Sequence, residues 1–255
     1  LRKFGIGTAY FVLRFVIVYY VLFSPRSNRD IYTYFRKRHG YSKWDSIGNI
    51  YQSYYTFGQT LTDKVAISTG LRDRFTYSHN GIEHIDNLLK KNQGGILISG
   101  HVGNFEISHY FLEDRYSISK ISMVTTHAEH REIKEYMERI SVKSHLKFIV
   151  VKDDMSHIFE IHTAIDEGGL VVFTGDRYMP GNKTLTETFL GKKAHFPMGP
   201  YLLASRLNLP VLFGELDDAG VFAFARTREN VRRPRCVELL RGQVGGVRRG
   251  RIHRT

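Results

Sequence analysis

The chain has 255 residues, of which 42% are hydrophobic, so it can bury one substantial core, and no Ser/Gly/Pro-rich linker divides it. Its net charge is +12, but residues 226–255 hold ten arginines against two acids and so carry +8 of it. The rest is mildly basic, which favours an anionic membrane surface or an acidic partner protein, and we expect no nucleic acid partner. Cys236 is the only cysteine, which excludes an internal disulfide and a multi-cysteine metal site.

An apolar segment lies at the N-terminus. Residues 4–23 contain a single charge, Arg14, and are long enough to cross a hydrocarbon core as a helix. Arg14 near the middle disfavours crossing, and the many aromatic residues suit a helix at the membrane interface. We expect residues 1–25 to be a membrane anchor, with a buried core helix as the alternative. The basic residues that follow place the main domain on the cytoplasmic side.

Helical and strand patterns alternate from residue 46 onward. Apolar residues at threes and fours predict a helix over 46–69, with a stop at Gly70, and a second helix within 81–95. Short apolar runs predict buried strands at 95–99, 120–125, 147–151, 170–175, 210–216 and 220–226. Further helices are expected at 104–114, 128–142, 154–167 and 199–207. This alternation predicts an α/β domain over 26–230, with a mainly parallel sheet flanked by helices and a ligand at the carboxyl ends of the strands.

The C-terminal segment 231–255 differs from the rest of the chain. Its basic residues are all arginine, and "GQVGGVRRGRIHRT" has almost no apolar periodicity. This composition predicts a disordered or unnatural end. A basic arm that binds anionic lipid or nucleic acid is the alternative.

The stretch "ISGHVGNFEIS", residues 98–108, contains a candidate catalytic pair. His101 follows an apolar strand at a turn, between Gly100 and Gly103, and Asn104 is a good N-cap for the next helix. Glu106 then falls in the first helical turn, where it can face His101. Such a pair suits general-base chemistry, in which the carboxylate orients the imidazole. A structural turn histidine is the alternative.

Four blocks in order resemble the lipid A late acyltransferases, the lauroyl and myristoyl transferases of the glycerolipid acyltransferase superfamily. They are "YTFGQTLTDK" (55–64), "GILISGHVGNFEIS" (95–108), "GGLVVFTGDRYM" (168–179) and "TFLGKKAHFPMGPYLLASRLNLPVL" (188–212). The resemblance implies transfer of a fatty acyl chain from an acyl-carrier-protein (or CoA) thioester to a hydroxyl of a glycolipid such as a lipid A precursor. It implies no cofactor and no metal, and a place at the cytoplasmic face of the bacterial inner membrane.

The resemblance also implies roles for particular residues. His101 is the base and Glu106 its orienting partner. The residues expected to bind substrate are Gly103, Asn104, Asp176, Arg177, Phe196 and Gly199. Arg177 suits an acceptor phosphate or a developing negative charge, because a guanidinium is planar and always charged; a structural Arg177 held by Asp176 is the alternative.

Other functions fit less well. The segment 175–184 ends in Gly-x-Lys-Thr but lacks the spacing of a phosphate-binding loop. There is no Gly-x-Ser-x-Gly elbow of a hydrolase and no His-Glu-x-x-His zinc motif. A non-catalytic peripheral membrane protein that binds anionic lipids remains the alternative, although it leaves the blocks around His101 and Arg177 unexplained.

Overall fold

The computed structural model describes residues 5–71, 74–75, 78–101, 115–116, 120–126, 147–179, 181–216 and 221–226. The chain divides into two compact units, Leu1–Phe75 with Leu190–Lys192, and Thr76–Phe189 with Lys193–Thr255. The Arg-rich tail and the helices predicted at 104–114 and 128–142 lie outside the described residues.

The first unit is helical. It contains α1 (Gly5–Phe23), α2 (Pro25–Thr33), a π-helix η1 (Tyr34–Arg38) and α3 (Lys43–Ser68). Ser42 caps α3, because its hydroxyl accepts a hydrogen bond from the Asp45 backbone N–H at 3.1 Å. The predicted stop at Gly70 is confirmed: this glycine has φ +89°, and the Leu71 N–H donates to the Ala66 carbonyl at 3.0 Å.

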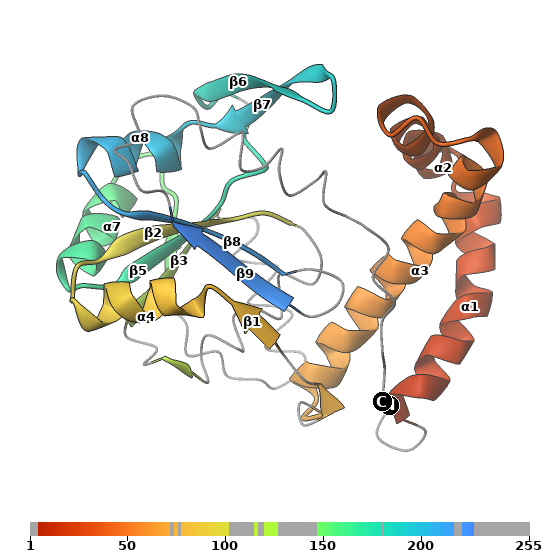
Figure 1. Ribbon diagram of the computed structural model, residues 1–255, viewed down its shortest axis with the longest axis horizontal. Helices are drawn as coiled ribbons and strands as arrows, with labels where there is room; N and C mark the ends of the chain where they lie inside the picture. Colours follow the sequence, from red (N-terminus) through yellow and green to blue (C-terminus); the bar gives the residue numbers. More distant parts are fainter. Residues whose placement is uncertain are drawn as a thin grey trace. The chain divides into compact units, whose positions relative to one another are not determined.

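Helices α1 and α3 run side by side and antiparallel (Figure 1). The Tyr10 hydroxyl donates to Asp63, and the rings of Tyr20 and Tyr54 lie 6.1 Å apart. Ile17 is the only residue of α1 that is buried, at 2% exposed. Helix α1 is also the one helix among the described residues that is long and apolar enough to cross a membrane. Five of its large apolar side chains are instead between 58% and 68% exposed: Phe11, Phe15, Tyr19, Leu22 and Phe23.

The second unit is built on a mainly parallel sheet. Its strands are β1 (Ser78–Asn80), β2 (Gly95–Ser99), β3 (Ile121–Thr125), β4 (Lys147–Val150), β5 (Leu170–Thr174), β8 (Val211–Leu216) and β9 (Val221–Arg226), in the order β1-β9-β8-β2-β5-β3-β4. The neighbours pair in parallel except β8 and β9, which are antiparallel. A separate hairpin joins β6 (Thr184–Phe189) to β7 (Lys192–Pro197). The predicted α/β fold is confirmed.

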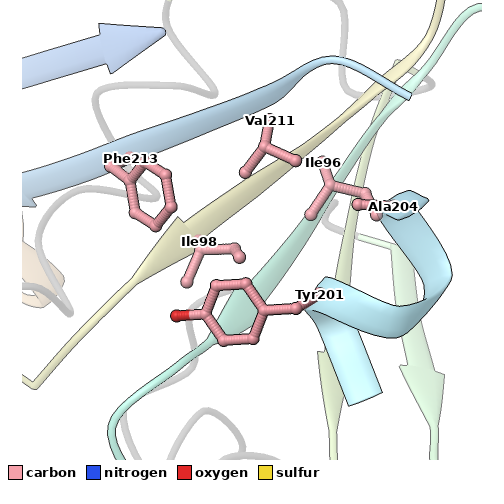
Figure 2. Close-up of a cluster of buried hydrophobic side chains, with 6 residues drawn as sticks. All are labelled: Ile96, Ile98, Tyr201, Ala204, Val211 and Phe213. Carbon is pink, nitrogen blue, oxygen red and sulfur yellow. The ribbon is translucent and has the colours of Figure 1, made fainter. Parts of the chain in front are cut away.

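Helices cover both faces of this sheet. Helices α7 (His157–Asp166) and α8 (Gly199–Arg206) pack on one face, and α4 (Ile82–Lys90) lies on the other (Figure 1). Figure 2 shows the cluster under α8, which consists of Ile96, Ile98, Tyr201, Ala204, Val211 and Phe213. Strand β2 is buried from Gly95 to Ile98, which is why its sequence is a continuous apolar run. The parallel pairing of β2 with β5 places the carboxyl ends of these two strands beside each other.

Gly94, just before β2, lies close to Ile165 of α7, so a substitution there tests how tightly α7 packs on the sheet. We expect Gly94→Ala to destabilise the protein by about 2–4 kcal/mol, because the substitution causes both backbone strain and a steric clash. The residue has φ +65°, and an added Cβ would lie 2.4 Å from the Ile165 backbone oxygen. Gly181→Ala is the matched control, since Gly181 has φ +88° but nothing within 4 Å of an added Cβ. Equal shifts of the two urea-unfolding midpoints would contradict the packing argument.

Candidate active site

The candidate site begins where β2 and β5 end. These adjacent parallel strands are in register, with Ser99 opposite Thr174, and the Gly175 N–H extends the ladder by donating to the Ser99 carbonyl at 2.7 Å. His101 and Asp176 each lie two residues beyond the last residue of their strand. The strand register therefore brings together two residues that are 75 positions apart in the sequence.

His101 and Asp176 form a hydrogen-bonded pair. The ring Nδ1 of His101 lies 2.9 Å from Oδ1 and 3.1 Å from Oδ2 of Asp176. The His101 backbone N–H also donates to Oδ2, at 3.2 Å. Because the carboxylate holds both the ring and the main chain of His101, the orientation of the imidazole is restricted. With an ionised Asp176, Nδ1 carries the hydrogen.

The electrostatics of Asp176 agree with this arrangement. Burial, the largest single influence, acts to raise its pKa, but the hydrogen bonds from the His101 ring and backbone and the nearby imidazole together lower the pKa below its ordinary value. The carboxyl is therefore ionised at neutral pH. The two side chains are 16% and 35% exposed for His101 and Asp176, so the pair is reachable from solvent.

Gly175 allows the two strand ends to approach closely. It is buried, and an added Cβ would lie 2.5 Å from Cγ2 of Ile98, a residue of the cluster in Figure 2. A larger residue would have to displace this core side chain or move the end of β5. The position of Asp176, which follows Gly175 directly, thus depends on the packing beneath it.

The other predicted site residues have separate surroundings. Arg177 is exposed, and no salt bridge joins it to Asp176 within the described part of the chain, where Asp176 instead pairs with His101. Phe196 is 8% exposed and makes an edge-on contact with Phe189 at 6.0 Å. Gly199 begins α8, and an added Cβ there would meet nothing within 4 Å. The predictions for Gly103, Asn104 and Glu106 lie outside the described residues.

The β6–β7 hairpin adjoins the segment that follows Asp176. The ring of Tyr178 lies 6.1 Å from that of His195, whose Nδ1 is 3.0 Å from the Thr186 hydroxyl. At the base of the hairpin, the Met198 N–H donates a hydrogen bond to the Lys183 carbonyl at 3.0 Å.

Over the ranges that the structure describes, no three His, Cys, Asp or Glu side chains gather as metal ligands would.

A histidine held by a carboxylate at the carboxyl edge of a mainly parallel sheet defines the chain as an α/β protein with a candidate general base where such folds bind ligands. A family model described as bacterial lipid A biosynthesis acyltransferase matches residues 50–213, almost two thirds of the chain. The chain belongs to this family and is an acyltransferase. The match includes both His101 and Asp176. A comparison with curated proteins gave no match.

The sequence alone missed the partnership between His101 and Asp176. It assigned Asp176 to substrate binding and paired His101 with Glu106, five positions away. A partial signal was present: His101 and Asp176 each lie within two residues of the end of a predicted apolar run, and the observed strand ends make the two offsets equal. Using it requires knowing that β2 and β5 are neighbours, because only adjacent strands bring equal offsets together.

Proposed function

We propose that this protein is a membrane-associated O-acyltransferase that moves a fatty acyl chain from an acyl-carrier-protein or CoA thioester to a hydroxyl of a glycolipid such as a lipid A precursor. Membership of the lipid A acyltransferase family supports the reaction class. The observation that carries the proposal is the His101–Asp176 pair, because a base of fixed orientation is what activation of a hydroxyl requires.

In the proposed reaction His101 is the general base. Its Nε2 takes the proton of the acceptor hydroxyl as the oxygen attacks the thioester carbonyl. The new C–O bond forms, the C–S bond breaks, and the imidazolium returns the proton to the leaving thiolate. Asp176 accepts the Nδ1 hydrogen at 2.9 Å and so positions the ring and stabilises the imidazolium. Glu106, outside the described residues, is proposed as a second carboxylate whose negative charge stabilises the imidazolium, because both ring nitrogens already have partners.

The proposed substrate contacts follow from side-chain chemistry. The exposed guanidinium of Arg177, one residue after Asp176, suits an acceptor phosphate or the developing oxyanion. Gly103 and Asn104 are proposed to shape the turn beside the attacked carbonyl. The other two proposed contacts are in the block 188–212. Phe196 supplies a buried aromatic wall, and Gly199 leaves room for close approach of a ligand to the backbone.

The same proposal places the protein at the cytoplasmic face of the bacterial inner membrane. The apolar α1, in which Ile17 is the only buried residue, favours membrane association. Basic residues after α1 are typical of the cytoplasmic side. No cofactor is required, since the thioester already carries the free energy of the transfer.

The proposed function is tested by product formation. Membranes carrying the protein are supplied with radiolabelled acyl-carrier protein, total lipid is extracted, and mass spectrometry identifies any new labelled species. We expect a labelled glycolipid whose ester linkage is cleaved by mild base. Membrane binding and vesicle flotation without any transfer, from either the carrier protein or acyl-CoA, would instead favour the non-catalytic lipid-binding alternative.

Salt should weaken the use of a carrier-protein donor. Carrier proteins of this type are expected to be acidic, and a basic enzyme surface would attract them. We expect KM for acyl-carrier protein to rise by roughly an order of magnitude between 0.05 and 0.5 M NaCl, with kcat nearly unchanged. Acyl-pantetheine, which lacks the protein, is the matched control, and its KM should stay constant. Parallel increases for both donors would remove electrostatic docking as the cause.

A further inference from the structure

We propose that α1 lies in one leaflet of an anionic bilayer, parallel to its surface, and does not cross it. The inference rests on the proposed membrane attachment and adds its geometry. Helix α1 is long enough to span, so its length leaves both arrangements open. The packing of α1 against α3 distinguishes them.

The apolar face of α1 points away from α3. At about 100° per residue, Phe11, Phe15, Tyr19 and Leu22 fall within an arc of about 80°. Their exposed fractions lie between 58% and 68%. The contacts with α3 come from nearly the opposite side, where Leu13 would be 2.7 Å from an added Cβ on Gly58. One side of α1 is thus available to lipid and the other is occupied.

The polar groups of α3 keep it out of the hydrocarbon core, while its exposed Phe57 and Leu61, 62% and 47% exposed, can reach the apolar side of the interface beside α1. Tyr54 and Asp63 of α3 contact Tyr20 and Tyr10 of α1, on either side of the middle of that helix. An α1 that spanned the bilayer would therefore carry this part of α3 into it. That segment and its ends carry an exposed Gln52, the carboxylate of Asp63 and the ammonium of Lys64. Polar and charged groups of this kind are costly in hydrocarbon. With α1 parallel to the surface, the polar and charged groups of α3 stay at the headgroup level or in water.

The charges of the helical unit also fit a single surface. Arg14 is exposed and projects between the apolar face of α1 and the face that packs on α3, so it can reach headgroups from a helix lying flat. Segment 24–42, directly after α1, holds one acid, Asp30, and five basic residues: Arg26, Arg29, Arg36, Lys37 and Arg38. Trp44, 77% exposed, has the ammonium of Lys43 5.7 Å from its ring. Basic and aromatic side chains together are typical of an anionic interface.

Two single-cysteine variants test the arrangement in a Cys236→Ser background. Gly7→Cys reports the N-terminal end of α1: it lies on the same side as Arg14, two turns away, and an added Cβ meets nothing within 4 Å. Ser27→Cys, on the exposed part of α2, is the matched control at the other end. Inverted inner-membrane vesicles from expressing cells receive a membrane-impermeant maleimide either outside or sealed in the lumen.

We expect both cysteines to react with external reagent and neither with reagent in the lumen. Reaction of Gly7→Cys only from the lumen, with Ser27→Cys reacting from outside, would show that α1 spans and would overturn the inference. Labelling of Gly7→Cys from neither side would contradict its place beside the water-facing Arg14. Protein that does not sediment with the vesicles would contradict membrane attachment itself, which is a failure of the proposed function and is separately visible in the sedimentation assay.

Discussion

Replacing His101 by alanine is expected to lower the rate of acyl transfer by about 10²–10⁴-fold, the usual contribution of a positioned general base. The loss should appear mainly in kcat, because the imidazole acts on the hydroxyl during attack and contributes little to binding of the thioester. Its side chain is 16% exposed and sits above the core, so the fold should survive its removal. The measurement is the steady-state rate with labelled acyl-carrier protein, together with the thermal unfolding midpoint.

His162→Ala is the matched control for this variant. His162 also has a carboxylate partner, with Nδ1 2.8 Å from Oδ2 of Asp166, but the pair lies on the surface of α7. Loss of an exposed histidine–aspartate pair should leave the rate of acyl transfer unchanged. Full activity of His101→Ala, with the same unfolding midpoint as the parent protein, would reduce His101 to a turn residue and remove the proposed mechanism.

The strands of the sheet could be predicted from sequence because burial on both faces leaves a simple pattern. Strand β2 coincides with the predicted 95–99 run, and β3 and β5 each differ from their runs by one residue at one end. Helix ends were harder: α3 begins at Lys43, before the predicted residue 46, because Ser42 supplies the cap. The π-helix η1 over Tyr34–Arg38 had no sequence signal, since its extra residue per turn leaves the composition unchanged.

The candidate site was predictable only in part. The position of His101 after a buried run, beside glycine, identified it as a candidate without any structure. Glu106 was chosen as its carboxylate partner by nearness in the chain and lies outside the described residues. The structure adds Asp176, a partner 75 positions away that the sequence did not indicate. That pairing depends on strand order. Strand β5 lies between β2 and β3 in the sheet, although β3 and β4 come before it in the sequence. Local patterns carry no information about such an order.

Asp176→Asn is expected to reduce kcat by about 10²–10⁴-fold while KM changes little. An amide is nearly the same size as the carboxylate, so packing is retained, but it carries no charge to stabilise the imidazolium. Its NH₂ group can also donate to Nδ1 and favour the ring tautomer that has its hydrogen on Nε2, which cannot accept a proton. Asp166→Asn on α7 is the matched control and should keep full activity, because its His162 partner is outside the site.

The difference in unfolding free energy between the parent protein and Asp176→Asn should also depend on pH. The pKa of Asp176 is lower in the folded chain than its ordinary value of 3.8, so the unfolded chain takes up more protons as the pH falls. The stabilisation from the ionised carboxylate is therefore complete above about pH 5 and declines as the pH falls through the lowered pKa. Urea unfolding of the parent protein and Asp176→Asn should show a gap at pH 7 that narrows below pH 4. A gap that widens on acidification would mean that burial, and not the hydrogen bonds from His101, controls this carboxyl.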